Sequence, residues 1–459
     1  MTPDWAEPGA KTGRGSGEVA VLAAAPLRDV PQVVVDDHMA ELARLADTAG
    51  ARPATTIVQR IDAPDSATYL RSGKVAQMRE AMRKHGATLA IFDEDLSPAQ
   101  GANLEKALGN RVIDRTELIL DIFALRARTW EAKRQVELAQ LHYLRPRLRR
   151  MWAHLSREGG GIGARGPGEQ QLETDRRLID RRIAKLKRDL ASVAASRQTR
   201  RRARRGRFNV VLVGYTNAGK SSILRRLSMT KTLVEDRLFA TVDSTTRACD
   251  LGGPGMAFLT DTVGFIRKLP HHLVASFRAT MEEVADADLL LHVIDGSHPR
   301  WEDQAETVVE TLQATGAGDI PVICVATKSD RLTHREERDA ALRARRFGRT
   351  VTASTVERGG LEGLKEALRD ALRARMVVVR IRFPVSAGAL IAEAHRAGEV
   401  LGRAFTQDDT ELVARIPMPL AGKLAQEPGV VVETLKARPG EHAHEENREK
   451  RWEVTASLT

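Results

Sequence analysis

Between Pro31 and Phe123 the spacing of apolar residues alternates between two periods. "ELARLADTAGA" predicts a helix and "TTIVQRI" a strand, while "KVAQMREAMRKHG" predicts a helix that ends at Gly86 and "ATLAIFDED" a second strand. Helices that alternate with short β-branched runs predict a small α/β domain over residues 31–124. Residues 1–30 are rich in Gly, Pro and Ala, and we expect them to form a disordered tail.

Residues 125–206 carry helical spacing instead. One leucine stripe within "WEAKRQVELAQLHYLRPRLRRM" is formed by Leu138, Leu141, Leu144 and Leu148. After a glycine-rich segment, a second stripe is formed by Ile179, Ile183, Leu186, Leu190 and Val193. Two amphipathic helices joined by a loop predict a helical hairpin, and Pro146 should kink or end the first helix.

Strand and helix patterns alternate again over residues 207–375. The strands "NVVLVG", "AFLTD", "LLLHVID" and "PVICVAT" are short and apolar, as in a parallel sheet covered on both faces. Residues 376–459 open with the strand "VVVRIRFP", continue with the helical pattern "GALIAEAHRAGEVLGRA", and reach a second strand, "TELVARI". We expect them to form a small α+β domain.

Charge is distributed unevenly along the chain. The net charge is +11 over 459 residues, a length that allows about three domains. Residues 145–207 contain 20 Lys or Arg but 6 Asp or Glu, an excess larger than the net charge of the whole protein. This concentration favours an anionic partner at the hairpin. The final run, "RQTRRRARRGR", is also compatible with a plain basic linker.

Cysteine usage and the absence of long apolar runs indicate a reducing, cytoplasmic location. Cys249 and Cys324 belong to no CxxC pair, which argues against a disulfide framework or a zinc site. The run "VAVLAAAP" follows an acidic leader, unlike a signal peptide. No segment approaches the length of a membrane span.

"GYTNAGKSS" contains the pattern G-x-x-x-x-G-K-[ST] from Gly214 to Ser221, after a predicted strand and before a predicted helix. In such a P-loop, backbone N–H groups and the helix N-terminus face phosphates. Lys220 would supply a positive charge to the β and γ phosphates, and the Ser221 hydroxyl would bind Mg²⁺. The alternative, a plain glycine turn, does not explain the Lys-Ser pair.

Three shorter motifs follow, each at the end of a predicted strand. "DTVG" begins at Asp261, which can hold Mg²⁺ through water, and ends at Gly264, whose amide can meet a γ-phosphate. "TKSD" ends at Asp330, whose carboxylate can accept the N1–H and 2-amino N–H groups of guanine. "AST" can offer a backbone N–H to guanine O6. Each motif alone is weak, but their order favours guanine over adenine.

A segment between the first two motifs, "LFATVDSTTRACD", has the character of a switch that offers a hydroxyl to Mg²⁺ when a γ-phosphate is present. Thr241, Thr245 and Thr246 are the candidates. A threonine-rich edge strand is the alternative reading, and the residues alone do not choose among these possibilities.

Taken together, "GxGxRGPGExxLExDRR" ahead of "GYTNAGKS", with "FATVDSTTR" and "DTVGFI" beyond, resembles the HflX family of translational GTPases. The resemblance covers residues 31–375 and, more loosely, the C-terminal domain. It implies a multidomain α/β protein: a small α/β domain, a helical hairpin, a Ras-like P-loop GTPase domain and a small α+β domain. It also implies a cytoplasmic, monomeric GTPase that uses Mg²⁺ and GTP, binds the large ribosomal subunit and its rRNA, and separates stalled ribosomes into subunits.

The resemblance also implies roles for individual residues. It selects Thr241 as the switch ligand of Mg²⁺ beside Ser221, with Thr245 still open. The residues expected to bind GTP are Gly214, Tyr215, Thr216, Asn217, Ala218, Gly219, Lys220, Ser221, Phe239, Ala240, Thr241, Val242, Asp243, Asp261, Thr262, Val263, Gly264, Thr327, Lys328, Ser329, Asp330, Ser354, Thr355 and Val356.

In this interpretation the glycine-rich segment binds RNA, because glycines fit a narrow crevice in RNA and arginines pair with its phosphates. The residues expected to bind RNA are Arg157, Gly159, Gly160, Gly161, Arg165, Gly166 and Gly168. Glu173, Asp175, Arg176 and Arg177 could brace the base of the loop by ion pairs, although a solvated charged face is the alternative.

Two positions depart from the usual GTPase pattern. Thr327 stands where Asn is commonest in the guanine motif, and its shorter side chain is expected to weaken the brace between the base and the P-loop. Phe265 follows "DTVG", where Gln would orient the attacking water, so no catalytic residue is assigned. We therefore expect slow hydrolysis alone and faster hydrolysis on a ribosome. An RNA-binding GTPase of ribosome assembly or RNA modification is the alternative function, and a scaffold that never hydrolyses nucleotide is a third.

Overall fold

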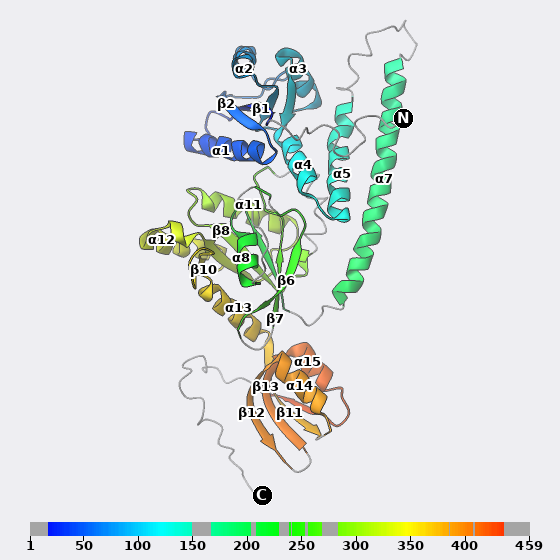
Figure 1. Ribbon diagram of the computed structural model, residues 1–459, viewed down its shortest axis with the longest axis vertical. Coiled ribbons are helices and arrows are strands. Elements are labelled where there is room, and N and C mark those ends of the chain that lie inside the picture. Colours follow the sequence, from blue (N-terminus) through cyan, green and yellow to red (C-terminus); the bar gives the residue numbers. More distant parts are fainter. Residues whose placement is uncertain are drawn as a thin grey trace. The chain divides into compact units, whose positions relative to one another are not determined.

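The computed structural model describes residues 17–148, 167–202, 208–228, 238–239, 241–252, 256–268, 283–384, 386–406 and 409–435 (Figure 1). The chain divides into two compact units. The first comprises residues 1–205, 209–249 and 258–364, and the second comprises residues 206–208, 250–257 and 365–459. Each unit is described by itself below.

A four-stranded sheet opens the first unit. Its strands are β1 (Val19–Ala24), β2 (Arg52–Val58), β3 (Leu89–Phe92) and β4 (Arg111–Asp114), in the order β2-β1-β3-β4. All three pairings are parallel. Parallel strands need crossover helices, and the chain supplies one after nearly every strand.

Those helices cover both faces of the sheet. Leu22 on β1 packs with α1 (Gln32–Thr48) and α4 (Arg115–Arg126) in one apolar cluster. Val21, the residue before it, packs with α2 (Ser72–His85) and α3 (Pro98–Leu108) in another. Neighbouring strand residues thus face opposite layers. The predicted α/β domain is confirmed, and α2 ends at Gly86 as expected, with φ of +63°.

Strand β1 corrects the expectation of a disordered tail over residues 1–30. Val19–Ala24 lies between β2 and β3, and five of its six residues are buried. Its composition, Val, Leu and Ala, resembles a low-complexity tail, but a central parallel strand buried on both faces shows the same unbroken apolar run.

The helical hairpin is also present. Helix α5 (Trp130–Leu144) gives way to a 3₁₀ turn at Arg145–Arg147, which contains Pro146, and α7 spans Pro167–Arg202. An apolar seam joins the two helices, and its members are Leu138, Leu141, Leu148, Ile179, Ile183, Leu186 and, partly buried, Leu190. Leu144 departs from the predicted stripe and packs on the α/β domain. Ion pairs of Glu137 with Arg182 (2.6 Å) and Arg145 with Asp180 (2.7 Å) flank the seam.

The predicted GTPase-like domain is built on a six-stranded sheet in the order β10-β9-β8-β5-β7-β6. Its strands are β5 (Phe208–Gly214), β6 (Thr245–Asp250), β7 (Met256–Asp261), β8 (Leu289–Asp295), β9 (Val322–Thr327) and β10 (Arg349–Ala353). Its helices include α8 (Lys220–Leu227), α11 (Trp301–Ala314), α12 (His334–Ala344) and α13 (Glu362–Ala374). The four strands predicted from apolar runs are confirmed, and the functional motifs follow their carboxyl ends.

The C-terminal part of the second unit is a four-stranded antiparallel sheet, β12-β13-β11-β14, formed by β11 (Met376–Pro384), β12 (Glu399–Phe405), β13 (Asp409–Pro417) and β14 (Val431–Thr434). Helices α14 (Gly388–Ala397) and α15 (Met418–Leu424) complete it. The pattern "GALIAEAHRAGEVLGRA" is therefore half helix and half strand.

Gly398 explains this change. A Cβ there would lie 2.5 Å from the Arg415 carbonyl oxygen on β13, so only glycine lets the chain leave α14 and pair at once.

Both cysteines, Cys249 and Cys324, are buried free thiols. No helix in the described part of the chain combines the length and the apolar character that crossing a membrane requires.

Candidate functional site

The P-loop, Gly214–Ser221, lies between β5 and α8. Gly219 adopts φ of +100°, a conformation that favours glycine. The Lys220 ammonium is buried and donates to the carbonyl oxygens of Gly214 (2.9 Å) and Tyr215 (2.7 Å). Burial lowers the pKa of Lys220 to about 8. A phosphate group at the N-terminus of α8 would favour the charged form of Lys220 again, because a nearby negative charge offsets the cost of removing the ammonium from water.

Three oxygen donors meet beside the P-loop. The Ser221 hydroxyl donates to Asp261 Oδ2 at 2.6 Å, the Thr241 hydroxyl donates to the same oxygen at 2.9 Å, and the two hydroxyl oxygens are 2.8 Å apart. Asp261 Oδ1 is buried without a hydrogen-bond partner among the described residues, and burial raises the pKa of this carboxyl. Such a set of hard oxygens, with one carboxylate oxygen unsatisfied, fits Mg²⁺.

The structure brings Thr241, and neither of its alternatives, to this cluster. Thr245 opens the strand β6, and the Thr246 hydroxyl lies 2.9 Å from that of Thr260. Since β6 is the last strand in the order of the sheet, the edge-strand interpretation applies to Thr245 and Thr246.

The segment after β7 lies directly against the P-loop. A Cβ on Gly264 would meet the Thr216 Cα at 2.8 Å and the Lys220 Nζ at 3.1 Å, so this position demands glycine. The Phe265 N–H donates to Gly214 O at 3.0 Å, and Phe265 O accepts from the Thr216 N–H at 2.7 Å. The Phe265 ring points into the apolar core, where it cannot orient a water molecule.

The guanine motifs converge at the ends of β9 and β10. The Thr327 hydroxyl lies 2.7 Å from Ala218 O on the P-loop, so the shorter side chain still makes a brace. The Ser354 hydroxyl donates to Asp330 Oδ1 at 2.7 Å and holds that carboxylate. The Ser354 N–H donates to Gly360 O, whereas the structure gives the Thr355 N–H no acceptor in the described part of the chain. Thr355 is therefore the free donor that guanine O6 would need.

Other predicted residues lie nearby but point elsewhere. Lys328 pairs with Asp295 at 2.6 Å, and the Thr262 hydroxyl donates to Leu212 O at 2.6 Å. Val356 is exposed, Ser329 starts a 3₁₀ turn, and Asn217 has φ of +61°. Ala240 lies outside the described residues. Four of the predicted GTP-binding residues are buried in the apolar cluster of the N-terminal domain instead: Tyr215, Phe239, Val242 and Val263.

That apolar cluster joins the N-terminal domain to the switch segments. The Phe239 ring packs on Phe123 of α4, with centroids 4.6 Å apart. Ile266, just after Phe265, belongs to the same cluster. The elements expected to respond to nucleotide are thus continuous with the core of another domain, which the motifs did not reveal.

Buried charges reinforce this junction. The Arg115 guanidinium, which is 1% exposed, binds Glu41 and donates to Asp93 at 2.8 Å. The Arg267 guanidinium also donates to Asp93, at 2.9 Å. The backbone N–H of Arg267 donates to the Tyr215 hydroxyl, and that hydroxyl donates to Glu41. Although burial opposes it, the guanidinium groups of Arg115 and Arg267 lower the pKa of Asp93.

Asp243 does not point toward the P-loop but connects the switch segment to the hairpin. Its carboxylate accepts the N–H groups of Arg128 (2.9 Å) and Thr129 (3.1 Å) and the Thr129 hydroxyl (2.6 Å). The Thr129 hydroxyl oxygen accepts the Ala132 N–H at 3.1 Å and so caps α5. A movement of the switch segment would therefore act directly on the first turn of the hairpin.

This contact gives a first prediction. Asp243→Ala should accelerate amide hydrogen exchange at Arg128–Ala132 by roughly 5- to 30-fold, because Asp243 holds the N-cap residue Thr129 and loss of a cap costs about 1–2 kcal/mol. Asp62→Ala, at an exposed surface pair with Arg28, serves as the matched control. Unchanged exchange at these amides would show that Asp243 does not hold the helix.

The RNA-binding prediction falls mostly outside the described residues, which exclude Arg157, Gly159, Gly160, Gly161, Arg165 and Gly166. Gly168 lies within α7, because the helix begins at Pro167 and not after the glycine segment; proline suits a first helical position. Below the loop, Arg177 pairs with Glu173 at 2.7 Å, while Asp175 is buried.

Three successive parts of the chain match known protein families. Family models match residues 36–124 (GTP-binding GTPase N-terminal), 126–204 (GTP-binding GTPase Middle Region) and 209–328 (50S ribosome-binding GTPase). The GTPase HflX of Magnetococcus marinus is 43% identical over 403 residues, or 87% of this chain and 92% of that protein. The GTPase HflX of Escherichia coli is 41% identical over 389 residues, or 84% and 90%.

A crystal structure of a GTP-binding protein from Sulfolobus solfataricus in complex with GDP is 22% identical, covering 77% of this chain and 98% of that one with a TM-score of 0.43.

Proposed function

The chain belongs to the HflX family of GTPases, and we propose that it hydrolyses GTP on the large ribosomal subunit, where it separates stalled ribosomes into their subunits. The family model for its GTPase domain describes ribosome-binding GTPases, which supports the choice of partner. We further propose that it acts as a monomer in the cytoplasm.

One observation carries this proposal: the basic segment begins on the hairpin whose first turn is held by a switch residue. Asp243 accepts the hydroxyl group of Thr129, the N-cap residue of α5, and residues 145–207 hold 20 Lys or Arg against 6 Asp or Glu. Positive charge attracts the phosphate backbone of RNA regardless of sequence. A nucleotide-dependent movement of Asp243 would change how that charge is presented.

We assign the nucleotide to the P-loop, with its guanine on Asp330 and Thr355. Mg²⁺, which would neutralise phosphate charge, is assigned to the hydroxyls of Ser221 and Thr241, with Asp261 contributing through water. Lys220 would exchange part of its carbonyl contacts for phosphate oxygens. The backbone N–H of Gly264, beside Lys220, would meet the γ-phosphate.

The glycine-rich segment before α7 is assigned to rRNA. Arg157 and Arg165 would pair with phosphates, while the residues Gly159, Gly160, Gly161, Gly166 and Gly168 would let the chain approach RNA closely. The apolar seam of the hairpin would keep this segment at a fixed distance from the switch.

Hydrolysis is expected to be slow in the free protein and on the order of 10²-fold faster with large subunits, because the buried Phe265 ring cannot position water and a ribosome would order the switches. The measurement is turnover of GTP with and without purified large subunits. Small subunits provide the control for nonspecific RNA. Equal rates in all three conditions would defeat the proposal.

A further inference from the structure

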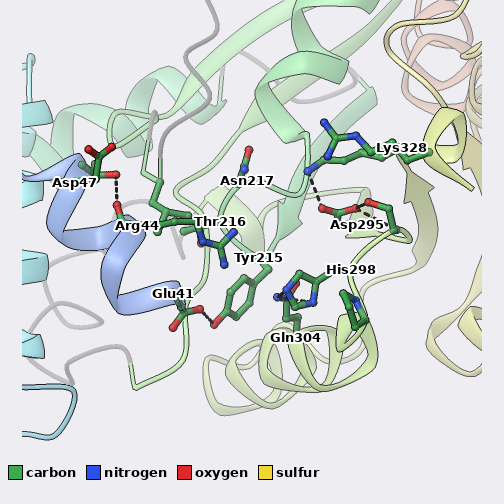
Figure 2. A pocket seen from close by; sticks show the side chains of 15 residues that line it. Glu41, Arg44, Asp47, Tyr215, Thr216, Asn217, Asp295, His298, Gln304 and Lys328 are labelled. Atoms are coloured by element: carbon green, nitrogen blue, oxygen red, sulfur yellow. Dashed lines mark hydrogen bonds and ion pairs between the residues drawn. The ribbon is translucent and has the colours of Figure 1, made fainter. Parts of the chain in front are cut away.

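A cavity of about 400 Å³ opens beside the P-loop, and one of its walls is supplied by another domain. Thr216, Asn217 and Lys328 line it from the GTPase domain, and Glu41, Arg44 and Asp47 line it from α1. Figure 2 shows the Arg44 side chain extending from α1 into this cavity. All of these residues belong to the first compact unit.

Helix α1 is anchored to the GTPase domain at two points. Asp37 pairs with His298 at 3.3 Å and with Arg300 at 3.5 Å. One turn further on, Glu41 accepts the hydroxyl proton of Tyr215, the residue that precedes Thr216 in the P-loop. These contacts fix both the position and the rotation of the helix.

The anchoring of α1 determines where the Arg44 side chain points. Residues three or four apart lie on one face of a helix, so Asp37, Glu41 and Arg44 share a face. With Glu41 bound to Tyr215, Arg44 projects one turn further along, beside Thr216 and Asn217. The structure gives its guanidinium no hydrogen-bond or ion-pair partner in the described part of the chain, and the side chain is exposed to the cavity.

The P-loop side of the cavity also holds an unsatisfied group. Thr216 is 7% exposed, and its Oγ1 has no hydrogen-bond partner among the described residues. Two other cationic residues line this cavity, namely Lys328, which is already paired with Asp295 at 2.6 Å, and Arg331. Lys220 is buried against the Gly214 carbonyl oxygen, and Phe265 turns its ring into the core.

We propose that Arg44 is an arginine finger supplied in cis by the N-terminal domain. This inference rests on the proposed function, in which GTP occupies the P-loop. Water attacks the γ-phosphorus, the bond to the β–γ bridging oxygen breaks, and GDP leaves with the electron pair while the proton of water passes to phosphate. The Arg44 guanidinium neutralises the charge that gathers on the bridging and γ oxygens.

The test is single-turnover hydrolysis of GTP by the full chain. Arg44→Ala should lower the rate about thirtyfold, the margin between a GTPase with its arginine in cis and one without it. Arg44→Lys should recover little, because an ammonium lacks the planar pair of donors. Arg79→Ala, at an exposed position of α2, should match the parent chain. An unchanged or faster rate in Arg44→Ala would overturn the proposal.

A second readout separates a finger from a structural role. Binding of GDP with aluminium fluoride, which imitates the transferring phosphoryl group, should be lost in Arg44→Ala, whereas affinity for GDP alone should change less than about threefold. Parallel loss of both affinities would show that Arg44 only supports the fold. Failure of the parent chain to bind GTP would instead refute the proposed function.

Discussion

Asp330→Asn is expected to move base preference from guanine to xanthine, with affinity for GTP falling about 10⁴-fold. A carboxylate accepts both the N1–H and the 2-amino N–H groups of guanine, whereas an amide sets its own N–H groups against one of them. Xanthine carries an oxygen in place of the 2-amino group and would accept that N–H. The Ser354 hydroxyl, 2.7 Å from Asp330 Oδ1, would keep the new side chain in place.

Fluorescence titration with GTP and XTP measures both affinities. Asp339→Asn, the same change at an exposed position of α12, should leave them as in the parent chain. If Asp330→Asn retained its affinity for GTP, guanine would not be read by this residue, and the assignment of the base to the ends of β9 and β10 would fail.

The double variant Arg157→Ala and Arg165→Ala should weaken binding to the large subunit by roughly 10²- to 10⁴-fold, because each charged hydrogen bond to phosphate contributes about 1.5–3 kcal/mol. The dependence of affinity on salt should also fall, by about one unit of slope for each arginine removed. Hydrolysis of GTP by the free protein should not change, since neither residue belongs to the P-loop site.

Co-sedimentation with large subunits at several salt concentrations gives both quantities. Arg335→Ala with Arg338→Ala removes the same charge from α12 and controls for net charge alone. Equal losses of affinity in the two double variants would mean that binding depends on net charge alone. The glycine-rich segment would then not be the RNA-binding site.

Local patterns predicted much of this protein. The P-loop, the strands before it and after it, and the seam of the hairpin each depend on residues close together in the chain. The errors arose where two structures share one pattern. The apolar run Val19–Ala24 fits both a tail and a central strand, and a helical pattern continued across Gly398 into β12.

Contacts between domains could not be predicted in this way. Asp243 and Thr129 are 114 residues apart, and Glu41 and Tyr215 are 174 apart. A carboxylate that holds an N-cap residue from a distant segment leaves no local signature, unlike the Ser97 capping box at α3. Arg115 likewise binds Glu41, which lies 74 residues away in the sequence.

Sedimentation of whole ribosomes is the sharpest test of ribosome splitting by this protein. With a non-hydrolysable GTP analogue, we expect the protein to convert stalled ribosomes into subunits and to remain on the large one, whereas with GDP it should do neither. Intact ribosomes under both conditions, with the protein bound only to precursor particles, would contradict it and favour a role in subunit assembly.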